Sequence, residues 1–129
     1  MSVVARQHGV RLVVRPTGTN ALDTRKLSNR SWINKWIANV TAEVAALRSE
    51  GVSGLNLDVE KFENTSADTK QLFTRAICEL HHSRLARNLS LHSLDTAIRG
   101  FTEFFDLPGL AKCVEFLLPM AYDMVEKDG

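Results

Sequence analysis

Three polar residues stand at every second position of an otherwise apolar stretch, and their types are those of an acid–base site. The stretch runs from Ser53 to Glu60, and its polar positions are Asn56, Asp58 and Glu60. Successive side chains of a β-strand point to opposite faces, so this spacing puts two carboxyl groups and an amide on one face. Two acids that share a buried face do not both ionise easily, and such a pair suits general acid catalysis. A strand end whose acids are neutralised by lysine, arginine or a metal ion is the structural alternative.

A second motif favours the catalytic interpretation. The stretch resembles the D-G-x-[DN]-x-D-x-E signature of family 18 glycoside hydrolases, the chitinase-like enzymes, with Gly54, Asn56, Asp58 and Glu60 on matching positions. Later in the chain, Met120-Ala121-Tyr122-Asp123 resembles the M-[ST]-Y-D motif of that family. An exo-acting, lysosomal branch of the family, which the chain resembles, also has asparagine rather than aspartate at the position of Asn56. The resemblance covers nearly the whole chain.

The resemblance implies a reaction and assigns residues to it. Family 18 enzymes hydrolyse β-1,4 bonds next to N-acetylglucosamine, as in chitobiose and chitin oligosaccharides, by a substrate-assisted retaining mechanism. By resemblance, the catalytic residues are Glu60 as general acid and base, Asp58 as the group that orients the substrate acetamido N–H, and Tyr122 as a donor to the acetamido carbonyl. No cofactor or metal is expected. The residues that the resemblance assigns to substrate binding are Asp123, Asn56 and Met120.

Some positions depart from the family pattern. Ser53 replaces the aspartate that usually begins the first motif, and Ala121 replaces a small hydroxyl residue in the second. The family usually brings an aromatic floor beneath the sugar from its last strands, whereas no tryptophan follows Trp36 here. The resemblance implies a (β/α)8 barrel, and whether the chain is an enzyme therefore depends on completion of that barrel. The alternative is a catalytically inactive barrel fragment, or a carbohydrate-binding or assembly module.

The elements that must position these residues alternate between strand and helix. β-branched and apolar runs predict strands from Val10 to Val14, through Leu57, from Leu89 to Leu94 and from Val114 to Ala121. Apolar residues at three- and four-residue spacing predict two long helices, one ending at Gly51 and one carrying Leu72 to Leu80. The expected N-caps are Ser28 or Asn29 for the first helix, Asn64, Thr65 or Ser66 for the second, and Asp106 for a short helix at Pro108 to Lys112.

This alternation predicts an α/β fold with a parallel sheet and helices outside it. The resemblance makes it a partial (β/α)8 TIM barrel, about half of one, with strands three to six. A full barrel takes roughly 250 residues, and the chain has 129, so residues 1–129 are expected to form a single partial catalytic domain. Both edges of four such strands would be exposed, so the missing half of the barrel is a candidate partner. An open four-stranded α/β sandwich is the fallback.

Composition gives few further constraints. A formal net charge of +1 gives no reason to expect nucleic acid or a membrane as partner. The partner that the resemblance implies is an N-acetylglucosamine-containing oligosaccharide. Cys78 and Cys113 lie in unrelated segments and predict buried free thiols. The first residues contain no secretory signal, so the chain as written would be cytoplasmic. The resemblance instead implies a lysosomal or secreted protein, and N-x-[ST] triplets at Asn29, Asn39, Asn64 and Asn88 agree with it.

Overall fold

A parallel β-sheet forms the centre of the molecule. The computed structural model describes residues 7–15, 21–22, 24–59, 61–62, 68–83, 90–97 and 105–120. The sheet has four strands in the order β1-β3-β5-β6, all parallel. Their bounds are β1 (Leu12–Val14), β3 (Val52–Asp58), β5 (Ser90–Ala97) and β6 (Leu118–Met120). A second, two-stranded parallel sheet pairs β2 (Ala21–Leu22) with β4 (Lys61–Phe62). The predicted α/β class with a parallel sheet is confirmed.

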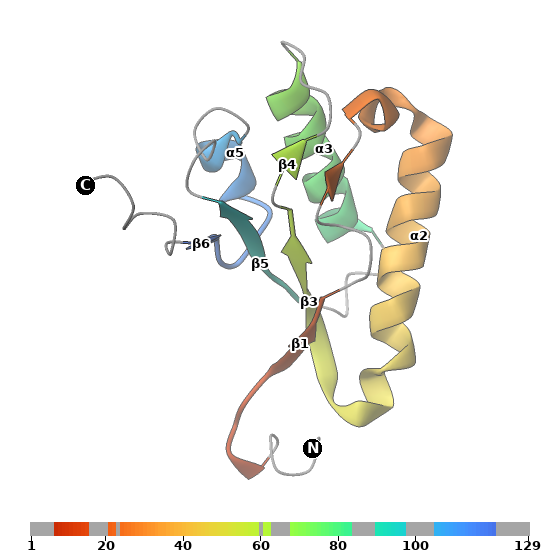
Figure 1. Ribbon diagram of the computed structural model, residues 1–129. Helices are drawn as coiled ribbons and strands as arrows, with labels where there is room; N and C mark the ends of the chain where they lie inside the picture. Colours follow the sequence, from red (N-terminus) through yellow and green to blue (C-terminus); the bar gives the residue numbers. More distant parts are fainter. Residues whose placement is uncertain are drawn as a thin grey trace, which may run out of the picture.

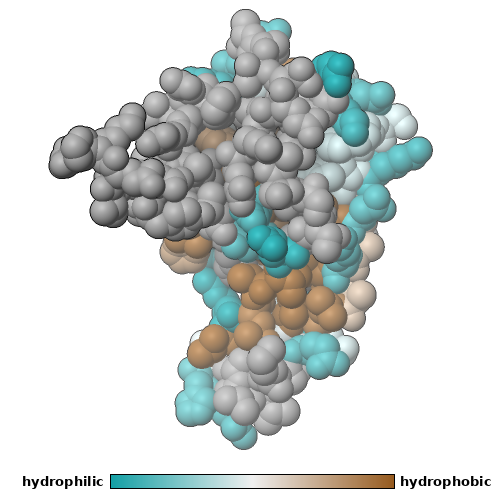
Figure 2. All heavy atoms as spheres, in the orientation of Figure 1, coloured by the Kyte–Doolittle hydropathy of each residue, from teal (hydrophilic) through white to brown (hydrophobic). Residues whose placement is uncertain are grey.

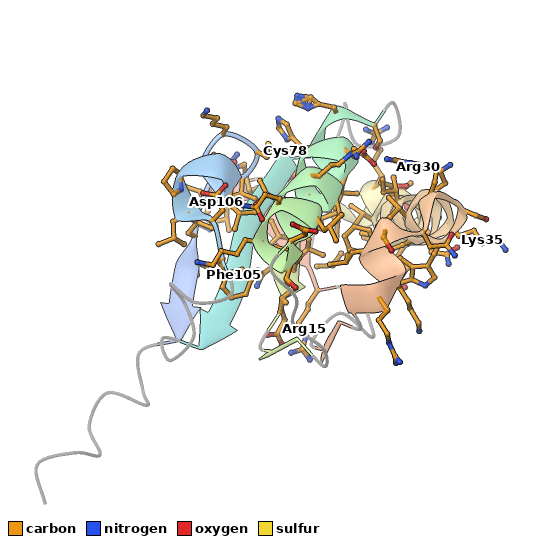
Figure 3. All side chains as sticks on the ribbon, turned by 90° about the horizontal axis from the view of Figure 1, so that it is seen from above. Arg15, Arg30, Lys35, Cys78, Phe105 and Asp106 are labelled. Carbon is orange, nitrogen blue, oxygen red and sulfur yellow. A yellow bond between two sulfur atoms is a disulfide. The ribbon has the colours of Figure 1, made fainter. Side chains whose placement is uncertain are left out.

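The helices lie along one side of this sheet, as Figures 1 and 3 show from two directions. The α-helices are α2 (Arg30–Ala46), α3 (Thr69–His82) and the short α5 (Leu107–Leu110). Two 3-10 helices, η1 (Thr24–Ser28) and η2 (Arg48–Glu50), flank α2. Leu55, Leu57 and Val59 are buried in the core, together with the predicted stripe of α3, in which Phe73, Ala76, Ile77 and Leu80 are buried and Leu72 is partly buried.

The other face of the sheet is exposed at its two edge strands in the described part of the chain. Val13 of β1 is 40% exposed, whereas its neighbours Leu12 and Val14 pack against the core. Leu118 of the opposite edge strand is 48% exposed. Figure 2 shows hydrophobic side chains gathered on this side of the molecule. Between these edges, Val52 and Asp58 of β3 lie on the same face and are only 8% and 5% exposed, so this face is exposed at its edge strands and buried at its centre.

The predicted cap of the first helix is confirmed. Asn29 is the N-cap of α2, and its Oδ1 accepts a hydrogen bond of 3.1 Å from the backbone N–H of Trp32. The α-helix ends earlier than expected, at Ala46, and the chain reaches Gly51 through η2. Gly51 has a φ of 88°, the left-handed conformation that glycine adopts without steric cost.

Other boundary predictions are also wrong: β1 begins at Leu12 rather than Val10, and β5 extends to Ala97 rather than Leu94. The second long helix begins at Thr69 with Asp68 as N-cap, after the candidate caps Asn64, Thr65 and Ser66, which lie outside the described residues. The strand expected from Val114 is only Leu118–Met120, because the Val114 N–H still bonds the Leu110 carbonyl at 3.0 Å in the turn that ends α5. Pro119 is tolerated because β6 is the last strand of the sheet. The predicted Asp106 cap of α5 is confirmed, since its side chain accepts from the Gly109 N–H.

The prediction of free thiols is also wrong. Cys78 of α3 and Cys113, just after α5, form a disulfide with a Cα–Cα distance of 5.0 Å. The two segments are unrelated in sequence, and only the packing of α5 against α3 brings them together. The disulfide therefore ties the segment that leads into β6 to the helix layer.

Candidate functional site

The described site residues lie at the carboxyl edge of the sheet. Asp58 is the last residue of β3, and Asn56 lies two positions before it, on the same face of the strand. The backbone of Asp58 is in register with Asp95 of β5, and Asp95 is in register with Leu118 of β6. The predicted strand through Leu57 is confirmed as β3, in which Leu55, Leu57 and Asp58 are buried and Asn56 is partly buried.

The second motif is described only at its first residue. Met120 ends β6, where its backbone pairs with Ala97, and its side chain is outside what the structure describes. Met120 lies two residues beyond Leu118, toward the same carboxyl edge as Asp58. Glu60, Tyr122 and Asp123 lie outside the described residues, so their predicted roles remain predictions.

Asp58 has a charged partner that the sequence analysis did not identify. Arg15, the first residue after β1, donates from Nη1 to Asp58 Oδ2. The side chain of Asp58 is 7% exposed and that of Arg15 is 66% exposed. The pair supplies the countercharge that a buried carboxylate needs.

The two carboxylate oxygens of Asp58 differ in their surroundings. Oδ2 is bound by Arg15, whereas Oδ1 is buried and has no hydrogen-bond partner among the described residues. A buried acceptor without a partner costs free energy, and such groups in native proteins call for an explanation. The arrangement can therefore accept one hydrogen bond from a donor that reaches this edge.

Arg15 could have been found from its position. It directly follows a predicted strand, and parallel strands place the residues that follow them at one edge of a sheet, where Asp58 also lies. No pattern in the sequence pairs Arg15 with Asp58, because 43 positions separate them. The Arg15–Asp58 pair also matches the structural alternative stated for this acid, in which a cation neutralises a carboxylate at the end of a strand.

Other chemical groups give no comparable site within the described ranges. No group of three or more histidine, cysteine, aspartate or glutamate side chains there is placed to bind a metal ion. His82 contacts the Cys78 carbonyl through Nδ1 at 3.2 Å near the end of α3. In the same residues, no helix has both the length and the apolar content to cross a bilayer.

Comparisons with known proteins agree with the motifs at a coarse level. No protein-family model and no solved structure matches the chain. The chain is 29% identical over 126 residues to the probable di-N-acetylchitobiase 1 of Dictyostelium discoideum. The match covers 94% of this chain and 32% of that protein, so the chain spans about a third of its relative's length. The similarity suggests a distant relationship to family 18 and a glycosidase-related function.

Proposed function

We propose that this chain is the catalytic part of a glycosidase that hydrolyses β-1,4-linked N-acetylglucosamine, in chitobiose or chitin oligosaccharides. The observation that carries the proposal is Asp58. It is a buried carboxylate at the carboxyl edge of a parallel sheet, with one acceptor oxygen unpaired among the described residues, in a chain similar to a chitobiase. Carboxyl ends of parallel strands are where barrel enzymes hold their catalytic groups.

The topology supports a barrel segment corresponding to strands three to six. The strands lie side by side in chain order, with the helices on one side, as in a singly wound barrel. A doubly wound sheet would reverse its strand order and carry helices on both faces. Arg11 and Glu115, which precede the two edge strands, form an ion pair at 2.7 Å. A curved sheet favours this pair, because a flat one would separate these strands by about 14 Å.

The proposed chemistry uses three residues and the substrate itself. Glu60, two residues beyond the end of β3, donates its proton to the glycosidic oxygen as the bond to the anomeric carbon breaks. The substrate acetamido oxygen attacks that carbon, while Asp58 accepts a hydrogen bond from the acetamido N–H and stabilises the cationic intermediate. Tyr122, two residues beyond β6, donates to the acetamido carbonyl. Glu60 then takes a proton from the water that opens the intermediate. Asn56, Asp123 and Met120 complete the proposed binding site.

A partner and a location follow from the same proposal. The exposed Val13 and Leu118 lie on the two edge strands, where the remaining barrel strands would pack. Residues 1–129 are then a single partial catalytic domain. Disulfides persist in oxidising compartments, so the Cys78–Cys113 bond supports a lysosomal or secreted location.

A second candidate function is a catalytically inactive barrel segment, acting as a carbohydrate-binding or assembly module. The exposed Val13 and Leu118 on the two edge strands favour it. Chitobiose binding that depends on Asp58, without hydrolysis, would support this candidate.

The test is hydrolysis of a fluorogenic chitobioside by the purified chain and its Glu60→Gln variant. Loss of the general acid should lower the rate by about 10² to 10⁴-fold. Glu50→Gln, at an exposed glutamate of η2, is the matched control and should keep the wild-type rate. Thermal unfolding of each variant checks that the fold is intact. Full turnover by Glu60→Gln would rule out the proposed mechanism.

A further inference from the structure

We propose that Arg15 is a positioning residue for this reaction. Its guanidinium holds Asp58 through Oδ2, so that Oδ1 is kept in place as the acceptor for the acetamido N–H of the substrate. The inference rests on the proposed function and extends it to a residue outside both sequence motifs.

Strand pairing places the two side chains together. Val14, the last residue of β1, is in register with Leu55 of β3. Arg15 follows Val14, and Asp58 lies three positions beyond Leu55, so the long arginine side chain reaches along the carboxyl edge to the carboxylate. Because the register of β1 and β3 sets this reach, the contact depends on the sheet rather than on a loop.

The ion pair differs from the others described in the molecule. Arg11 binds both oxygens of Glu115, at 3.2 and 2.7 Å, and Arg30 likewise binds both oxygens of Glu79. Those pairs are bidentate and lie at the surface. Arg75 adds a single contact from Nε to Glu79 Oε1 at 3.1 Å, so both oxygens of each of these glutamates are bound. At Asp58 a single Arg15 nitrogen binds one oxygen, and the second oxygen is buried without a partner among the described residues. A pair that served stability alone would gain by satisfying both oxygens.

The free oxygen suits a donor that arrives with the substrate. An acetamido N–H donated to Oδ1 turns the acetamido carbonyl oxygen toward the anomeric carbon that it attacks. If Arg15 is removed, Asp58 loses the contact that fixes its rotation about the side-chain bonds. The substrate can still bind, but the acetamido group is no longer held for attack. Loss of Arg15 should therefore lower kcat more than it raises KM.

The experiment compares Arg15→Ala, Arg15→Lys and Arg11→Ala in the full chain with the fluorogenic chitobioside. Misplacement of the acceptor in Arg15→Ala should lower kcat by about 10²-fold with little change in KM. Arg15→Lys should recover part of this loss, and added guanidinium ion should raise the activity of Arg15→Ala only. Arg11→Ala, which removes an arginine ion pair at the other end of β1, should keep the wild-type kcat.

A double variant separates positioning from a merely structural role. If Arg15 acts through Asp58, Arg15→Ala combined with Asp58→Asn should be no slower than Asp58→Asn alone. Wild-type kcat in Arg15→Ala, or independent losses in the double variant, would overturn the inference while the Glu60→Gln result still stood. Absence of hydrolysis by the wild-type chain, or full turnover by Glu60→Gln, would instead overturn the proposed function, and the inference would fall with it.

Discussion

At the scale of single residues, alternation along β3 is the most informative feature. It places Asn56 and Asp58 on one face and the core leucines on the other, because the pleat of a strand leaves no other arrangement. The partner of Asp58 does not follow from this alternation. Arg15 is 43 positions away in the sequence, and only strand pairing makes it a neighbour. The local sequence pattern thus predicts the position of Asp58, and only the tertiary structure shows that Arg15 is its counter-ion.

Glu79 offers a residue-level prediction about pH. A hydrogen bond from Arg30 lowers the pKa of Glu79 below its ordinary value of 4.5, and Arg75 adds to the effect, while partial burial opposes it. A lowered folded-state pKa means that the stabilisation is present above the unfolded pKa and is lost as pH falls through the folded pKa. We expect Glu79→Gln to lose about 0.5–1 kcal/mol of stability at neutral pH.

This difference from the wild type should shrink as pH falls below the ordinary value of 4.5. Urea unfolding of both proteins across an acidic pH series measures it. Glu50→Gln is the control and should track the wild type. A Glu79→Gln deficit that stayed constant down to the lowest pH would contradict the ion-pair explanation.

At the scale of elements, the sequence predicts helices better than their boundaries. The apolar stripe of α3 packs as expected, and Asn29 caps α2 as expected, because both signals are local. The start of α3 at Thr69 and the short β6 were not predicted. The first residues of α3 and β6 depend on where the chain must turn to reach the next element. Several residue types can form such a turn, so the sequence does not fix its position.

The cap of α2 gives a prediction at this scale. Asn29→Ala removes the side-chain acceptor of the Trp32 N–H and should cost about 1 kcal/mol, within a usual range of about 0.5–2 kcal/mol. Thermal unfolding followed by circular dichroism measures the loss. Asn34→Ala, at an exposed position within the same helix, should be neutral or stabilising because alanine is the better helix former. Equal effects of the two changes would argue against capping.

At the scale of the whole molecule, the sheet has one face covered by helices and one face that is exposed at its edge strands. The disulfide between Cys78 and Cys113 and the ion pair between Arg11 and Glu115 both join segments far apart in sequence. Both act on the segment between α5 and β6. The segment that leads to the second motif is therefore held mainly by the disulfide to the helix layer, because an exposed ion pair such as Arg11–Glu115 contributes little.

We expect the disulfide to be a main source of stability for this segment. Closing a loop with a sequence separation of 35 residues should contribute on the order of 2–4 kcal/mol. A variant with both Cys78→Ser and Cys113→Ser should unfold at correspondingly lower urea concentration. Reductant should lower the stability of the wild type toward that of the variant and leave the variant unchanged. A wild type insensitive to reductant, with its thiols shown to be free, would contradict the bond.

The sequence by itself determined the α/β class, the alternation along β3, the cap of α2 and the two motifs that suggest a glycosidase, because each follows from residue types a few positions apart. Only the tertiary structure decided the strand order, the Cys78–Cys113 bond and the pairing of Arg15 with Asp58. These contacts join segments separated by 35 and 43 positions. No local pattern encodes them, because they arise when apolar faces pack and strands pair in register.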